Sequence, residues 1–191
     1  MKMHLSLSLS ASFVFLVSVF LSGFAWADTP EAVALAYFSD LESGNYAAAA
    51  EKFDPEQLAE FRTQMEFYKE IPLDAQSQFI QMFFGSADSV ESIDKLTDVE
   101  FFSGLFVFMQ RQVELAGRLS FDGIEILGSV EEGEDVSHLV TRNRVSVEEI
   151  EIEALEVVSL KKQGEKWYMM LQGQLKGLPQ QLKIGFGAAN K

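Results

Sequence analysis

The residues that could take part in chemistry are few and are spread over the whole chain. An apolar site can shift the pKa of a histidine, tyrosine or carboxyl group toward neutrality and so allow it to transfer protons. An arginine nearby can hold an anionic or carbonyl group. The sequence therefore favours acid–base chemistry or ligand binding in an apolar site. The candidate ligand-binding residues are His138, Tyr37, Tyr68, Trp167, Tyr168 and Arg142.

Other kinds of chemistry lack the residues that they need. The sequence contains no cysteine, and beyond residue 27 its one histidine is His138, so a zinc site would depend on carboxylates. It contains neither the G-x-S-x-G turn of serine hydrolases nor a glycine-rich phosphate loop. The acidic residues of 131–135 lack the spacing of a calcium-binding loop. We expect no metal and no cofactor.

The spacing around His138 allows two interpretations. His138, Arg142 and Arg144 are separated by multiples of two and so share one face of a strand. If that face lines a pocket, an anionic or carbonyl ligand would meet two guanidinium groups there. The alternative is a hairpin that places Arg144 opposite Glu151 and Arg142 opposite Glu153, as ion pairs on a solvated face.

The first 27 residues have the features of a secretory signal peptide. Lys2 precedes an uncharged apolar run, and Ala25 and Ala27 flank Trp26 in the A-x-A order of a cleavage site. The stretch 5–27 is also long enough to be a retained membrane anchor. We expect cleavage before Asp28, export to the periplasm or the medium, and no stable membrane insertion afterwards.

Composition limits the partners of the remaining chain. Removal of residues 1–27 leaves 164 residues, which predicts a single domain over 28–191. This part carries 14 basic and 29 acidic side chains, a net charge of −15. Nucleic acids and anionic lipids are poor partners for such a surface. Without cysteines, stability must come from core packing.

Capping residues and apolar spacing predict that the first half of the chain is helical. Thr29 followed by Pro30, and Asp54 followed by Pro55, are typical helix starts, and residues 97–100 form a T-x-x-E capping box. The helix after this box has apolar residues around most of its circumference. Such a helix can be fully buried, covered by a second copy of the chain, or in contact with an apolar ligand.

After Gly117 the apolar period changes from helical to alternating. Strands are predicted at about 119–130, 136–147, 150–161 and 166–174, with glycine turns at 132–133 and 163–164. Helices followed by an antiparallel meander predict an α+β fold.

Two regions resemble the nuclear transport factor 2-like superfamily. They are "AVALAYFSDLESGNYAAAAEKFDPEQLAEF" near the start, and "DVSHLVTRNRVSV" with "LEVVSLKKQGEKWYMML" near the end. The resemblance implies a cone, in which N-terminal helices pack on a curved antiparallel sheet. The superfamily includes isomerases, dehydratases and polyketide cyclases as well as exported binding domains, so the fold alone does not select a function.

Three functions follow as hypotheses. The first is an exported, non-catalytic binding or accessory domain for a small apolar molecule or a protein partner. The second is a lyase or isomerase that uses general acid–base catalysis in the cone, with His138 and a tyrosine as the pair. The third is a structural homodimer joined through the apolar helix. An enclosed pocket that contains His138 would favour the enzyme, and a cone filled by phenylalanine side chains would favour binding or structure.

Overall fold

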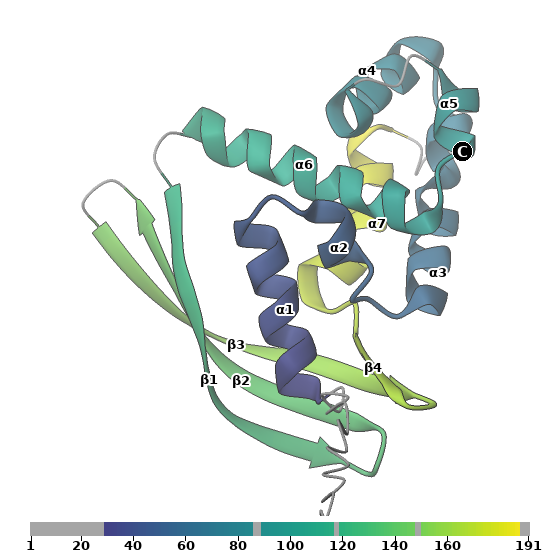
Figure 1. Ribbon diagram of the computed structural model, residues 1–191. Coiled ribbons are helices and arrows are strands. Elements are labelled where there is room, and N and C mark those ends of the chain that lie inside the picture. The colour runs from purple at the N-terminus through teal and green to yellow at the C-terminus, as the bar shows by residue number, and fades with distance from the viewer. Residues whose placement is uncertain (1–28, 86–88, 117–118, 148–149, 188–191) are drawn as a thin grey trace, which may run out of the picture.

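The computed structural model has an α+β fold in which helices pack on one side of a curved, four-stranded antiparallel sheet (Figure 1). It describes residues 29–85, 89–116, 119–147 and 150–187. The predicted signal peptide lies outside these ranges. The sheet is open, and the helices lie on its concave side (Figure 1). The predicted fold class is confirmed.

Within the described residues, six α-helices and one 3₁₀ helix precede the sheet, and three of the α-helices begin at the predicted caps. Thr29 Oγ1 accepts a hydrogen bond from Ala32 N at 3.2 Å, and Asp54 Oδ1 accepts one from Glu56 N at 2.9 Å. The capping box is also formed, with Thr97 N donating to Glu100 Oε2 at 2.7 Å. The segments are α1 (Pro30–Glu42), α2 (Tyr46–Ala50), α3 (Pro55–Met65) with the 3₁₀ turn η1 (Glu66–Lys69), α4 (Leu73–Phe84), α5 (Val90–Asp94) and α6 (Asp98–Ala116).

The sheet follows chain order, with β1 (Leu119–Glu132), β2 (Val136–Val147), β3 (Ile150–Gln163) and β4 (Lys166–Met169) as successive neighbours. Strand β1 has two irregularities in its pairing with β2, one at 121–124 and one at 126–128. Gly123 lies within the first and has a φ of 111°, a conformation that residues with side chains rarely adopt. Such bulges bend a strand, which accounts for the concave shape of the sheet.

The hairpin between β2 and β3 has a different register from the predicted one. Arg144 lies opposite Glu153, where we predicted Glu151, and Arg142 lies opposite Leu155, where we predicted Glu153. The cause is the position of the turn, because Val147 pairs with Ile150 and the hairpin is therefore centred one residue later along the chain than predicted. The predicted register was wrong by two positions. A shift of two keeps every side chain on its predicted face.

The end of the chain also differs from the prediction. The strand predicted at 166–174 ends at Met169, and helix α7 (Gly173–Gly185) follows. Gly173 has a φ of 52°, which redirects the chain. Leu175, Leu178 and Leu182 then recur at helical spacing and pack on the core.

Aromatic side chains fill the space between the helices and the sheet. Phe53 lies at the centre, with its ring centroid 5.3 Å from that of Tyr37 and 5.1 Å from that of Phe102. Ala49 and Ala50 are fully buried, so helix α2 packs closely against its neighbours. In α6 the apolar residues of 101–106 are largely buried, which confirms packing as their first role. None of the described helices combines the length and apolar character needed to cross a membrane.

Candidate functional site

Burial alternates along β2 and separates the polar residues of the strand onto two faces. Leu139, Thr141 and Asn143 are buried beneath the helices, on the concave face. His138 and Arg142 alternate with them and so point to the convex, solvent-facing side. These two predicted site residues therefore lie outside the cone.

His138 is held by polar partners on both sides. Its Nδ1 lies 2.6 Å from Ser159 Oγ, and its Nε2 lies 3.0 Å from Glu132 Oε2. Serine, histidine and a carboxylate also make up catalytic triads, in which the serine Oγ must be open to substrate. Ser159 is only 1% exposed, so its hydroxyl is not presented to a substrate. The arrangement joins three strands across the convex face.

Both arginines of β2 form ion pairs with carboxylates on neighbouring strands. Arg142 Nη1 donates to Glu125 Oε2 at 2.8 Å, and Arg144 Nε donates to Glu153 Oε1 at 3.0 Å. Arg142 Nε is also 3.8 Å from Glu153 Oε2. The guanidinium groups thus meet the charges of their own sheet on a solvated face, as the ion-pair interpretation describes.

Tyr68 lies in the helical part of the core, away from the sheet. Its ring stacks on Phe79 with centroids 5.1 Å apart, and its hydroxyl donates to Asp94 Oδ1 at 3.3 Å. Burial, with a smaller effect of the Asp94 charge, raises the pKa of Tyr68 to about 12. The phenol is therefore a neutral hydrogen-bond donor at physiological pH, with a structural partner.

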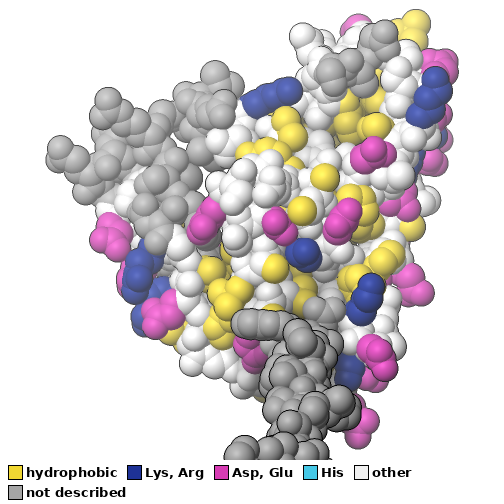
Figure 2. All heavy atoms as spheres, in the orientation of Figure 1, with side chains coloured by type: hydrophobic (Ala, Val, Ile, Leu, Met, Phe, Trp, Pro, Cys, Tyr) yellow, Lys and Arg dark blue, Asp and Glu magenta, His cyan; other side chains and the backbone are white. Residues whose placement is uncertain are grey.

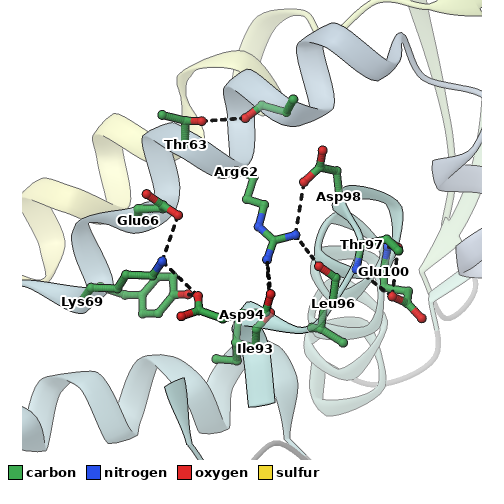
Figure 3. Close-up of polar contacts among 12 residues, drawn as sticks. Arg62, Thr63, Glu66, Lys69, Ile93, Asp94, Leu96, Thr97, Asp98 and Glu100 are labelled. Atoms are coloured by element: carbon green, nitrogen blue, oxygen red, sulfur yellow. Dashed lines mark hydrogen bonds and ion pairs between the residues drawn. The ribbon is translucent and has the colours of Figure 1, made fainter. Parts of the chain in front are cut away.

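Near Tyr68, Arg62 connects α3 to the turn between α5 and α6 (Figure 3). Its Nη2 donates to the backbone oxygens of Ile93 at 3.3 Å and Asp94 at 3.2 Å. Its Nη1 donates to the Leu96 oxygen and, at 3.1 Å, to Asp98 Oδ1. One guanidinium thus satisfies three carbonyl groups and a carboxylate and fixes the start of α6.

Trp167 and Tyr168, on β4, line an open groove of about 280 Å³ between β4 and α1. Lys52 and Lys166 also line it, and Lys162 Nζ lies 5.9 Å from the centroid of the Trp167 ring. Strand β4 is held in place through Phe53, with which Met169 forms a β-bridge. The structure therefore brings these two predicted residues together, but not with the others.

Tyr37 is the predicted residue that belongs to the concave face. It is 7% exposed, and burial together with the nearby Glu156 carboxylate raises the pKa of its hydroxyl well above the usual range. Glu156 also accepts a hydrogen bond from Asn143 Nδ2, at 2.7 Å from its Oε2. Tyr37, Asn143 and Glu156 form a polar group, the concave-face cluster, between α1 and the sheet.

Asn143 has one polar atom that its surroundings do not satisfy. The side chain is 6% exposed, and Oδ1 is a buried atom with no hydrogen-bond partner among the described residues. In the sheet, Asn143 lies between Ile124 and Ala154. An amide oxygen in apolar surroundings can accept a hydrogen bond from an N–H or O–H group of a ligand. Glu156 is exposed, so the cluster lies at the edge of the covered area.

Sequence reasoning missed Asn143 and Glu156. Both occupy inward positions of strands whose other inward residues are mostly apolar. An asparagine at a buried position of this kind is unusual, because buried polar groups are costly. Thr141, Asn143 and Val145 are alternate residues of β2 and so share one face. The polar Asn143 between them was the signal in the sequence.

Comparisons of this chain with protein-family models, with curated proteins and with solved structures find no match. The concave-face cluster and the two convex-face arginines are therefore interpreted from their geometry alone.

Proposed function

We propose that this chain is an exported, non-catalytic binding domain of the nuclear transport factor 2-like type. Its ligand is a small apolar molecule with one hydrogen-bond donor, which binds on the concave face of the sheet. The observation that carries the proposal is the buried Asn143 Oδ1, which has no partner among the described residues. An unsatisfied buried polar group destabilises a fold by roughly 1–3 kcal/mol, so its presence suggests a function.

The side chains around Asn143 favour binding over acid–base catalysis. His138, the one histidine beyond residue 27, lies on the convex face. The Glu156 carboxylate is hydrogen-bonded to Asn143, and the Tyr37 phenol holds its proton more tightly than usual. The aromatic filling around Phe53 also agrees with a domain that binds an apolar molecule. A lyase or isomerase would need a group that exchanges protons near neutral pH.

The binding test uses N-phenyl-1-naphthylamine, an uncharged apolar fluorophore with one N–H group. We expect its fluorescence to rise on binding to the protein, and Asn143→Leu to weaken binding roughly three- to tenfold, the value of one hydrogen bond. The ether 1-phenoxynaphthalene, which has no N–H, should bind both proteins equally. Arg142→Gln, on the opposite face, is the matched control and should change neither affinity.

Two results would contradict the binding proposal. One is a wild-type protein that binds neither fluorophore. The other is an Asn143→Leu variant that binds the amine as tightly as the wild type does. Export is tested separately, by the mass of the protein in the periplasm or medium. A product that begins at Asp28 supports it, and one that retains residues 1–27 opposes it.

A further inference from the structure

A second groove, of about 360 Å³, lies among the helices, away from the sheet. Helices α4 and α6 line it, together with Ser92 of α5 and Leu96 of the segment that joins α5 to α6. Apolar atoms reach the surface where α4 and α6 meet (Figure 2). We call this second groove the α4–α6 groove. Its lining includes Phe83, Phe84, Leu96, Gly104, Val107 and Arg111.

Gly104 allows the two helices of this groove to approach each other. A Cβ atom at this position would lie 3.0 Å from the backbone oxygen of Phe83 and 3.0 Å from the ring of Phe84. The position therefore has little room for a larger residue. Close contact at Gly104 brings the Phe84 ring against α6 and adds apolar surface to the groove.

The two ends of the groove carry opposite charges, but only one of them is already paired. Glu100 and Arg111 line the groove from α6, eleven positions apart, which is roughly 16 Å along a helix. The Glu100 carboxylate accepts hydrogen bonds from Thr97 N at 2.7 Å and Thr97 Oγ1 at 2.9 Å. The acidic end therefore serves to cap the helix.

Arg111 has no such partner. Within the part of the chain that the structure describes, Arg62, Arg142 and Arg144 each form an ion pair, whereas Arg111 forms none. This is notable in a chain with 29 acidic and 15 basic residues. The guanidinium lies over Gly85, with its Nη2 2.7 Å from where a Cβ would be. Gly85 caps the C-terminal end of α4, whose dipole favours a cation there.

We propose that the α4–α6 groove binds a straight-chain fatty acid, with the carboxylate on Arg111 and the alkyl chain along the phenylalanine rings. The planar guanidinium offers two parallel donors to a carboxylate, a strong and directional arrangement. Phe84, Leu96 and Val107 offer apolar contacts to a chain that needs no hydrogen bonds, whereas a peptide would bring backbone groups that require partners. This inference uses other residues than the concave-face cluster and does not depend on it.

The Arg62 contacts hold the groove in shape before the ligand arrives. Arg62 donates to the backbone oxygens of Leu96 and Ile93 and so fixes the segment that contributes Leu96 to the groove (Figure 3). A site that is already formed loses less conformational freedom on binding. We therefore expect the groove to bind without a large rearrangement of α5.

The test is calorimetric titration of the purified protein, expressed from the full sequence, with decanoate and with decan-1-ol. We expect Arg111→Gln to weaken decanoate binding about tenfold, because it removes a charge-assisted pair at a partly solvated site, and to leave decan-1-ol binding unchanged. Arg144→Gln, which removes an exposed arginine from the sheet, is the matched control and should alter neither. Val107→Trp should weaken both ligands by filling the groove.

Three results would overturn the inference: no decanoate binding by the wild type, equal decanoate affinity in Arg111→Gln, or an equal loss in Arg144→Gln. Arg111 is exposed, so its substitution is not expected to impair folding, and circular dichroism checks this. Weaker decanoate binding by Asn143→Leu would also count against it, because the concave face would then be the decanoate site. A failure here leaves the concave-face proposal unaffected.

Discussion

Replacement of Asn143 by leucine should make the protein more stable while it weakens ligand binding. Most substitutions of buried residues lower stability, so the direction of this effect is diagnostic. The amide oxygen of Asn143 is buried without a partner among the described residues. If this oxygen serves to bind a ligand, its unpaired state lowers the stability of the ligand-free protein.

The size of the effect follows from three contributions. Removing the unsatisfied oxygen relieves roughly 1–3 kcal/mol. Losing the 2.7 Å hydrogen bond from Asn143 Nδ2 to Glu156 costs about 1 kcal/mol, because Glu156 is exposed and can turn to water. The leucine gains about 1 kcal/mol from apolar burial between Ile124 and Ala154, and an imperfect fit of the larger side chain cancels this gain. The net change is about 1 kcal/mol of added stability, or a Tm rise of about 2–4 °C.

The measurement is urea unfolding of the ligand-free protein, followed by circular dichroism. Thr141→Val is the matched control, because Thr141 is a fully buried neighbour whose hydroxyl donates to the Glu156 backbone oxygen at 3.3 Å. It should lose about 0.5–1.5 kcal/mol, the value of a satisfied hydrogen bond. A loss of stability in Asn143→Leu as large as that in Thr141→Val would refute the reasoning, since the amide would then be a structural group.

Three further predictions concern the polar groups of the helical half. Arg62→Ala should lower the free energy of unfolding by about 2–4 kcal/mol, since three carbonyl groups lose their donor, and Arg62→Lys should restore little of it in urea unfolding. A hydrogen bond from Lys69 holds the pKa of Asp94 below its usual range. The ionised carboxylate therefore stabilises the fold above about pH 4, and this stabilisation is lost as the pH falls through the lowered pKa. When the free energy of unfolding is measured against pH, Asp94→Asn should show a smaller decrease in acid than the wild type. Burial raises the pKa of Tyr68 to about 12 and shifts that of Tyr37 in the same direction, so the stability that their neutral forms provide is present below about pH 10 and declines above it; phenolate absorbance of these two should appear together with unfolding, and ionisation of both in a folded chain would contradict this.

Local signals in the sequence predicted the helical half well. Proline after a capping residue at Asp54, and the capping box at Thr97, act within one turn of helix, so no distant contact can easily override them. Glycines with positive φ, such as Gly44 with 72°, end elements in the same local way. The order of elements and the fold class followed from these signals and from the change of period after Gly117.

Long-range geometry was predicted less well, because it depends on contacts that no short stretch contains. The hairpin after Val147 has neither an Asn-Gly nor an Asp-Gly pair to fix its turn, and the register was wrong by two positions. Strand β4 ends at Met169, which forms a β-bridge with Phe53, more than a hundred residues upstream. The local sequence at 166–174 favoured a strand, but it carried no information about this distant partner.

The same limit explains why the predicted site residues are spread over several places. Histidine, arginine and tyrosine attract attention because of their chemistry, yet His138 and Arg142 alternate with the buried residues of β2 and so face solvent. What distinguishes a binding face is a polar group where the alternation requires an apolar one. Asn143 is such a group, because its neighbours across the sheet are Ile124 and Ala154 and its oxygen lacks a described partner. In a sheet with one buried face, a polar side chain that breaks the alternation is therefore a better guide to a ligand site than a reactive side chain that obeys it.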